Sequence, residues 1–371
     1  MSCDVSVVMP LYNAKDLVKF TVDSVLNQTL ENIEVLIIDD CSTDDSLAVC
    51  RELYGSDKRV RILQQPQNMG PGAARNRGIN EASGKYIAFV DSDDEILPDA
   101  LSKMLETAKK YDADVVHNTK YFVHSLDKDC NVPLQLIDDD VILSPISGNA
   151  GGEEYTEITH LSDDLSSRFD DWKNRRISWN VFSKLFRRAF LADHNIHFSD
   201  MKFAEDMVFC FECLFKAENY VMVPDQSYVY RLIGTSLSRA KKTSAKIVTA
   251  LKAQIGAVRN MNRILHEVPF FSQNPQKAVY ALERVLDDIE GGYIRPAYQE
   301  LGEETLRSDN LIHEFMCEEF GDKAHYVEFL FYELHKNYEP VIDYIGMAGD
   351  IENLRAMNKS LREKEQSKNE L

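Results

Sequence analysis

The stretch Lys85-Tyr-Ile-Ala-Phe-Val-Asp-Ser-Asp-Asp94 joins a short apolar run to a cluster of carboxylates. Tyr86 to Val90 is rich in β-branched and aromatic residues, so it predicts a buried strand. Carboxylates at the carboxyl end of such a strand lie where open α/β sheets bind ligands. Asp91 and Asp93, with Ser92 between them, offer the oxygen ligands that Mg²⁺ and Mn²⁺ prefer. A solvated turn that caps the following helix is the alternative.

Apolar runs alternate with helix-period segments in the first part of the chain. Strands are expected at residues 5–9, 33–38, 60–63, 86–90 and 114–117. Helices are expected at residues 17–28, from Ser42 or Asp44 to 53, at 71–82 and at 97–111. This order predicts an α/β fold with a Rossmann-like, mostly parallel sheet that helices flank on both faces. Polar residues follow nearly every expected strand, so one edge of the sheet carries the chemistry, as a nucleotide site requires.

Four segments occur in order in this part of the chain. They are Val5-Ser-Val-Val-Met-Pro-Leu-Tyr-Asn13, Ile37-Ile-Asp-Asp-Cys-Ser-Thr-Asp44, Asn68-Met-Gly-Pro-Gly-Ala-Ala-Arg-Asn-Arg-Gly78 and Phe89-Val-Asp-Ser-Asp-Asp94. Together they resemble the family 2 glycosyltransferases of the GT-A fold, strongly over residues 4 to about 118 and more weakly to about 240. The resemblance implies an inverting enzyme that moves a sugar from a nucleotide diphosphate, most simply UDP, to a hydroxyl. It also implies Mn²⁺ or Mg²⁺ as the cofactor.

The same segments supply the expected donor site. The Tyr12 ring, at the tip of the first strand, would cover a nucleobase, a contact worth ~1–3 kcal/mol; the alternative is an aromatic that covers the strand end. Asp40 would accept the imide N–H of uracil, unless the neighbouring Asp39 does so. Gly70 lets backbone approach a ligand, and Arg75 supplies a cation for phosphate or base. The resemblance adds Pro10, Asn13, Asn68 and Ser92 to this site, Asp91 at the ribose or the metal, and Asp93 on the metal.

Glu205 and Asp206 stand just before an apolar helix in the second half of the chain. In an inverting transfer a carboxylate must take the proton of the attacking hydroxyl from within ~2.6–3.2 Å. The pair resembles the family segment that carries this base, and Asp206 is preferred to Glu205. Arg231 belongs to a segment, Tyr228 to Ser238, that resembles the loop closing over the diphosphate, where it would neutralise the leaving phosphate. Carboxylates that favour a helix N-terminus and a plain surface arginine are the alternatives.

Three regions are expected. Residues 1–118 form the nucleotide-sugar-binding half of the GT-A domain, and residues 119–240 form its acceptor-binding half. A polar insertion at about 124–165 is expected to be a loop ordered by substrate. Residues 241–371 form a helical region without a catalytic signature, which would serve in homo-oligomerisation, in binding a partner or at a membrane.

The charge of the chain limits its partners. A formal net charge of −19 argues against nucleic acid. Basic residues nevertheless gather around two tryptophans; they are Arg168, Lys173, Arg175, Arg176, Lys184, Arg187 and Arg188. This patch, Arg168 to Arg188, predicts peripheral contact with an anionic membrane that holds a lipid-linked acceptor; a charged helix face packed on acidic neighbours is the alternative. No run reaches the ~18–20 apolar residues of a membrane span, and a cytoplasmic location is expected, at the inner face of the membrane if the patch binds lipid.

The sequence fits two other functions less well. A sugar nucleotidyltransferase would show a Gly-rich basic loop after the first strand, which Pro10-Leu-Tyr-Asn13 lacks. A binding or scaffold subunit would have lost its chemistry, whereas both carboxylate pairs are intact. The sequence therefore favours an enzyme that glycosylates a glycan or a lipid-linked glycan in surface polysaccharide synthesis.

Overall fold

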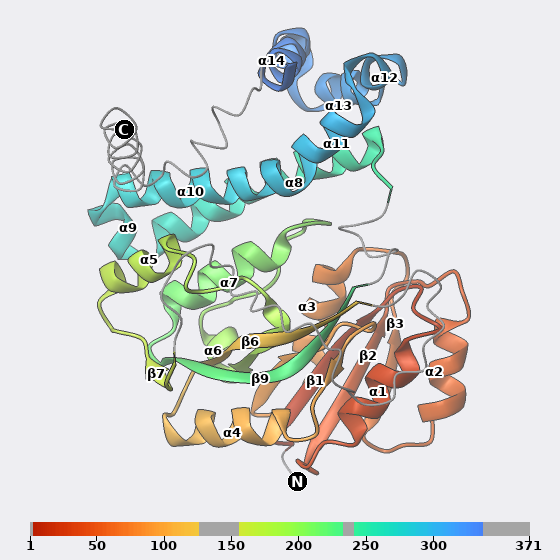
Figure 1. Cartoon of the computed structure of the whole chain (residues 1–371), viewed down its shortest axis with the longest axis vertical. Helices are drawn as coiled ribbons and strands as arrows, with labels where there is room; N and C mark the ends of the chain where they lie inside the picture. The colour runs from red at the N-terminus through yellow and green to blue at the C-terminus, as the bar shows by residue number, and fades with distance from the viewer. Residues whose placement is uncertain (1–2, 126–155, 233–240, 337–371) are drawn as a thin grey trace, which may run out of the picture. The chain divides into compact units, whose positions relative to one another are not determined.

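The computed structural model describes residues 3–125, 156–232 and 241–336 (Figure 1). The chain divides into two compact units, Met1–Ala240 with Lys252–Val279, and Lys241–Leu251 with Tyr280–Leu371. The helical region expected from residue 241 is thus shared between the units, because its residues 252–279 pack with the first one. Most of the insertion expected at 124–165 lies outside the described residues.

The first unit contains the sheet and the helices around it. Its strands are β1 (Val5–Leu11), β2 (Ile33–Asp39), β3 (Val60–Gln64), β4 (Tyr86–Phe89), β5 (Glu95–Ile96), β6 (Val115–Ser125), β7 (Thr159–His160), β8 (Lys184–Arg187) and β9 (Tyr220–Leu232). Its helices are α1 (Val18–Leu26), α2 (Ser46–Tyr54), α3 (Pro71–Glu81), α4 (Ala100–Lys110), α5 (Leu165–Lys173), the short 3₁₀ helix η1 (Val181–Ser183), α6 (Arg188–Asp193), α7 (Glu205–Lys216), most of α8 (Ser244–Glu267), and α9 (Pro269–Gln273).

The strands form one sheet in the order β3-β2-β1-β4-β8-β6-β9-β5, and β7 pairs with β9. β1 runs parallel to β2 and β4, and β2 runs parallel to β3, as the alternation of strands and helices predicts. β8 runs antiparallel to β4 and β6, and β5 to β9, so the sheet is mixed beyond β4. Each strand predicted from the sequence is present, which confirms the α/β class. The short strands β5, β7 and β8, and the long strand β9, were not predicted.

Alternate residues of β1 contact different helices, α1 and α4 on one face of the sheet and α3 on the other, and Figure 1 shows these helices around the sheet. Val7 shares one core with Val22 of α1 and Leu105 of α4. On the other face, a Cβ on Gly78 of α3 would lie 2.2 Å from Val8 Cγ1, so only glycine permits this packing. Because a helix that follows a parallel strand runs back along the sheet, the N-terminus of α3 lies at the carboxyl edge of β1 and β4.

Aromatic rings fill the space between β4 and α7. Phe89 of β4 meets Phe198 and Phe209 edge to face, with ring centroids 5.3 and 6.1 Å away. Phe198 and Phe209 stack on each other at 4.0 Å. Such aromatic pairs add about 0.5–1.5 kcal/mol each to the energy of burial. They hold α7 against the end of β4, where the acidic residues follow.

The second unit is helical in its described part. It holds the first residues of α8 (244–251), most of α10 (Pro275–Ile289), the π-helical turn η2 (Glu290–Ile294), α11 (Arg295–Leu301), α12 (Glu303–Ser308), α13 (Leu311–Phe320), the 3₁₀ turn η3 (Gly321–Lys323) and α14 (Ala324–Lys336). Across the described ranges, each helix is too short or too polar to cross a membrane. Homo-oligomerisation through this region stays a prediction.

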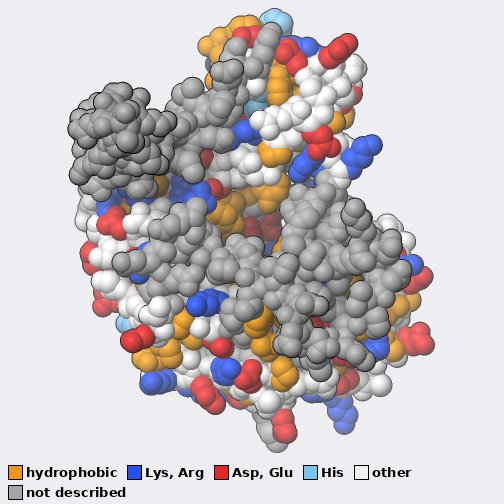
Figure 2. All heavy atoms as spheres, viewed as in Figure 1, with side chains coloured by type: hydrophobic (Ala, Val, Ile, Leu, Met, Phe, Trp, Pro, Cys, Tyr) orange, Lys and Arg blue, Asp and Glu red, His pale blue; other side chains and the backbone are white. Residues whose placement is uncertain are grey.

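The basic residues from Arg168 to Arg188 lie only in part at the surface. Arg168 and Lys184 are each only 1% exposed, because both donate hydrogen bonds to backbone carbonyl groups inside the fold. Arg187 pairs with Asp114 at 3.1 Å. On the face seen in Figure 2, basic and acidic side chains are interspersed. Arg168 and Lys184 therefore do not belong to an exposed patch, and membrane contact through the remaining basic residues stays a prediction.

Candidate active site

The acidic turn, Asp91 to Asp94, follows β4 directly. Asp91 and Asp93 are partly exposed, whereas Asp94 is fully buried. The two oxygens of Asp94 accept hydrogen bonds from the Tyr228 hydroxyl (2.7 Å) and the Arg231 backbone N–H (2.8 Å). Burial, and then the charges of Asp93 and Asp91, raise the pKa of Asp94 well above its usual range. Asp94 thus supports the turn and leaves the other two carboxylates for a ligand.

A divalent ion fits the chemistry of Asp91 and Asp93. Both residues carry carboxylate oxygens and are separated by one small residue. Within the described part of the chain, no group of three or more His, Cys, Asp or Glu residues could hold an ion by itself. Mg²⁺ is commonly bound through one or two carboxylates together with substrate phosphates. The turn therefore suits an ion whose remaining ligands come from a diphosphate.

Arg75, on α3, joins the acidic turn to the start of α7. Its two terminal nitrogens lie 2.8 Å from Asp91 Oδ1 and 2.8 Å from Glu205 Oε1. The side chain is buried, and its guanidinium lies over the Phe198 ring, 5.4 Å from the centroid. The role predicted from the sequence, a cation for phosphate or base, stays a prediction. In this structure Arg75 brings two separate acidic motifs into one site.

Glu205 and Asp206 form the first turn of α7. Glu205 is 4% exposed, and Asp206 is partly exposed. Burial, and then the charge of Asp206, raises the pKa of Glu205 to about 7. Burial also raises the pKa of Asp206, against the lowering effect of Arg75. Because Glu205 is enclosed and bound to Arg75, Asp206 is the member of the pair that an acceptor could reach.

The sequence predicts that Arg231 lies on a loop. In the structure it lies on strand β9. Its side chain is buried, pairs with Glu95 and donates to the backbone carbonyl of Asp93 at 3.0 Å. Its predicted action on a leaving phosphate stays a prediction. Residues 233–238 of the expected closing loop lie outside the described residues.

Tyr12 and Asn13 follow β1 at the same edge of the sheet. Tyr12 is 47% exposed, so its ring is open to a flat ligand. The Asn13 side-chain oxygen accepts the backbone N–H of Thr43 (2.8 Å), and the Asn13 backbone N–H donates to Ser42 Oγ (3.1 Å). These bonds tie the loop after β1 to the loop after β2. Pro10 is buried inside β1 and shapes the strand that carries Tyr12.

Asp39 and Asp40 have different surroundings. Asp39 Oδ1 accepts the backbone N–H of Ser42 at 3.2 Å, and its buried Oδ2 has no hydrogen-bond partner among the described residues. Asp40 accepts the backbone N–H groups of Met69 (2.8 Å) and Gly70 (2.7 Å). Asp39 therefore holds the turn after β2, whereas Asp40 lies against the loop of the third motif. Asp40 remains the candidate for binding the nucleobase, because both of its carboxylate oxygens have further lone pairs.

Lys202 lies near Gly70 and Asp40, a position that the sequence did not indicate. A Cβ on Gly70, where φ is +88°, would lie 3.7 Å from the Cα of Lys202. The Lys202 charge opposes the effect of burial, which raises the pKa of Asp40. Asn68, two positions before Gly70 in the chain, is exposed. A single lysine between two motifs has no spacing pattern, so only the fold reveals its place.

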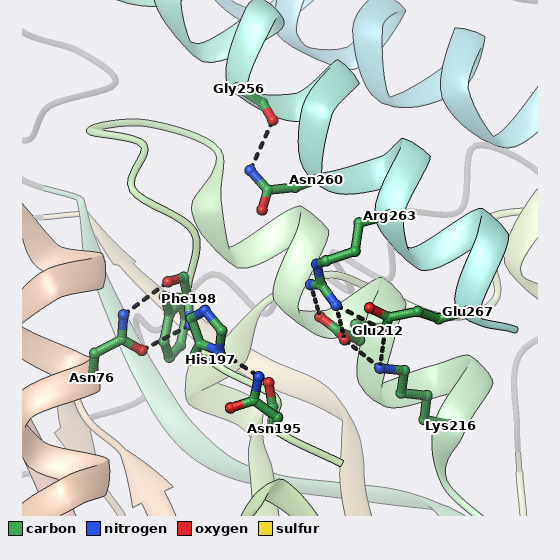
Figure 3. Close-up of polar contacts among 10 residues, drawn as sticks. All are labelled: Asn76, Asn195, His197, Phe198, Glu212, Lys216, Gly256, Asn260, Arg263 and Glu267. Atoms are coloured by element: carbon green, nitrogen blue, oxygen red, sulfur yellow. Dashed lines mark hydrogen bonds and ion pairs between the residues drawn. The ribbon is translucent and has the colours of Figure 1, made fainter.

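Two polar clusters hold the segments around Arg75 and α7 in place (Figure 3). The Asn76 side chain, on α3, donates to the Phe198 carbonyl and accepts the Phe198 N–H, both at 2.8 Å. Glu212 of α7 is buried and pairs with Lys216 (2.6 Å) and with Arg263 of α8 (2.7 Å). The first cluster holds the ring under Arg75, and the second anchors the helix that carries Glu205 and Asp206.

The chain is similar to known proteins in sequence and in fold. The family model described as "Glycosyl transferase family 2" matches residues 6–133 of the chain. Putative glycosyltransferase EpsH of Bacillus subtilis is 30% identical over 267 residues, which cover 71% of this chain and 71% of EpsH. Uncharacterized glycosyltransferase EpsJ of the same bacterium is 31% identical over 235 residues, which cover 63% of this chain and 62% of EpsJ. The match thus spans less than two thirds of EpsJ.

The structure of S. aureus TarS 1-349 in complex with UDP-GlcNAc is similar over 97% of this chain and 92% of that chain, with a TM-score of 0.56 and 20% identity. At this identity the likeness concerns the fold alone, which is the GT-A fold.

Proposed function

Since the chain belongs to glycosyl transferase family 2, we propose that it transfers a sugar from a UDP-sugar to a hydroxyl of a glycan or lipid-linked glycan, with inversion at the sugar carbon. The observation that carries this proposal is the Arg75 bridge, which brings the acidic turn and the Glu205–Asp206 pair into one site. An exposed Tyr12 suits stacking on a base. TarS, which shares the fold, binds UDP-GlcNAc, and this supports UDP as the nucleotide.

In the proposed reaction Asp206 is the base. Its carboxylate takes the proton of the acceptor hydroxyl while the hydroxyl oxygen bonds to the anomeric carbon of the sugar. The bond from that carbon to the diphosphate oxygen breaks, and the nucleoside diphosphate leaves with the electron pair. A base works best when its pKa lies near the working pH, and burial moves the pKa of Asp206 upward, in that direction.

Asp91 and Asp93 would hold Mg²⁺ or Mn²⁺. The bound ion would neutralise negative charge on the diphosphate, as metal ions do in phosphate chemistry. Arg75 fixes the Asp91 carboxylate from the protein side at 2.8 Å, so this ligand is oriented before a donor binds. Preorganised charge of this kind needs no rearrangement during reaction.

Calorimetric titration with UDP, with and without Mn²⁺, tests the proposal. We expect Mn²⁺ to strengthen UDP binding, because the acidic turn alone would repel a diphosphate. Equal binding with and without the ion would refute the metal-dependent transferase. A thermal-shift screen of UDP-, GDP- and dTDP-sugars then identifies the donor.

A further inference from the structure

Strand β9 supports the acidic turn through the side chain of Tyr228. The Tyr228 hydroxyl donates to Asp94 Oδ2 at 2.7 Å and accepts the backbone N–H of Asp91 at 3.2 Å. Tyr228 is buried, so water does not compete for these bonds. One hydroxyl therefore joins the first and last residues of the turn and limits how far they can separate.

Arg231, three positions along the same strand, holds the middle of the turn. Its backbone N–H donates to Asp94 Oδ1 at 2.8 Å, and its guanidinium donates to the Asp93 carbonyl at 3.0 Å and pairs with Glu95. The backbone of β9 also pairs with the two residues that follow the turn. Every residue from Asp93 to Ile96 is thus in contact with β9.

We propose that Tyr228 and Arg231 are positioning residues, which set the separation of the Asp91 and Asp93 carboxylates and thereby the affinity of the donor site for a divalent ion. This inference rests on the proposed function. Small ions such as Mg²⁺ demand near-ideal geometry from their ligands. Groups that orient metal ligands typically change metal affinity about 10–100-fold when they are removed. Neither residue needs to touch the ion, because both act on the backbone of the turn and on Asp94.

Tyr228 also packs in the core, and this role must be separated from positioning. Its ring stacks on Phe182 with centroids 4.3 Å apart. The Tyr228→Phe variant keeps this ring contact and removes only the hydroxyl. Tyr220→Phe is the matched control, because Tyr220 lies on the same strand, is equally buried and loses a hydroxyl bonded to His117 Nδ1 at 3.2 Å.

The experiment measures free Mn²⁺ by electron paramagnetic resonance in the presence of saturating UDP, for the wild type and both variants. We expect Tyr228→Phe to bind Mn²⁺ about tenfold or more weakly than Tyr220→Phe. UDP binding without metal should be the same in all three proteins, because the residues proposed to bind the nucleobase, Tyr12 and Asp40, do not lie on β9. This metal-free binding also shows that each variant is folded.

A second variant covers the case in which Tyr228→Phe fails to fold. Arg231→Lys keeps the charge and the backbone N–H but cannot reach the Asp93 carbonyl and Glu95 together, because lysine lacks the planar fork of arginine. We expect it to weaken Mn²⁺ binding as well. Wild-type affinity in Arg231→Lys and in any folded Tyr228→Phe would overturn the inference. A wild type that binds no Mn²⁺ with UDP would instead refute the proposed function.

Discussion

Arg75 Nη1 and Glu205 Oε1 lie 2.8 Å apart, although the two residues are 130 positions apart in the sequence. The same guanidinium binds Asp91, so one buried cation serves a carboxylate from each half of the domain. A charge removed from water costs several kcal/mol unless a partner offsets it. Loss of the guanidinium would leave Glu205 buried without its counter-ion, and the bridge therefore holds the acidic turn close to the start of α7.

Removal of Arg75 should destabilise the fold. In Arg75→Met, the buried Glu205 and the partly exposed Asp91 both lose their counter-ion, so we expect the free energy of unfolding to fall by about 3–5 kcal/mol. Urea denaturation measures this change. The double variant Arg75→Met with Glu205→Gln should recover part of the loss, because it removes one unpaired charge.

A surface pair provides the control for that experiment. Arg61 pairs with Glu81 where both side chains are about 40% exposed, and such pairs contribute about 0–1 kcal/mol. Arg61→Met should therefore change the free energy of unfolding little. An equal effect of Arg61→Met and Arg75→Met would contradict a special role for the bridge.

Gly72→Ala should displace the proposed base, Asp206, although the added Cβ would contact its neighbour Glu205. A Cβ on Gly72 would lie 2.9 Å from Glu205 Cγ and 3.3 Å from Phe198 Cβ. The start of α7 must move to admit it, and overpacking of this kind costs about 1–3 kcal/mol. We expect lower stability, measured by urea denaturation, and slower transfer, measured by a transfer assay. Gly291→Ala, where nothing lies within 4 Å of the added Cβ, should neither lower stability nor slow transfer.

Stability should depend on pH through Glu205. Burial and the Asp206 charge raise the pKa of Glu205 from 4.5 to about 7 in the folded state. A raised pKa contributes stability that is complete below pH about 4.5 and is lost as pH rises through about 7. Relative to Glu205→Gln, which cannot ionise, the wild type should lose roughly 1–3 kcal/mol between pH 4.5 and 8.

Urea denaturation of both proteins across this pH range measures the difference. Asp206→Asn should move the midpoint to lower pH, because it removes the charge that raises the Glu205 pKa. A difference between wild type and Glu205→Gln that stays constant with pH would show that Glu205 does not titrate in this range.

The local features of the chain were predictable, and the distant partners of its charged residues were not. The strand at residues 86–90 and the carboxylates after it follow from an apolar run that ends in acidic residues. The partners of Arg75 depend on how α3 and α7 pack, and no spacing encodes that. Arg168 was expected at the surface because composition reveals charge and not direction; its carbonyl partners at the end of α7 leave no trace in the sequence.

Arg231 illustrates a different limit. The segment around it contains Gly and Ser, which are typical of loops, and the resemblance placed a closing loop there. The structure continues β9 through Leu232, because Arg231 and Leu232 pair with the end of β6 and Tyr228 and Val229 pair with β5. A two-residue strand such as β5 has no periodic pattern, so its pairing partner could not be inferred either.

Substitution of two aspartates should separate donor binding from chemistry. Asp93→Ala removes a ligand of the proposed ion and should abolish the Mn²⁺-dependent part of UDP binding. Asp206→Asn keeps the shape of the side chain but cannot take a proton, so it should bind UDP and Mn²⁺ normally and lose about 10²–10⁴-fold in transfer rate. Calorimetry and a transfer assay with the identified donor measure the two effects. If Asp206→Asn transferred sugar at the wild-type rate, Asp206 would not be the base, and Glu205→Gln would be the next variant to assay.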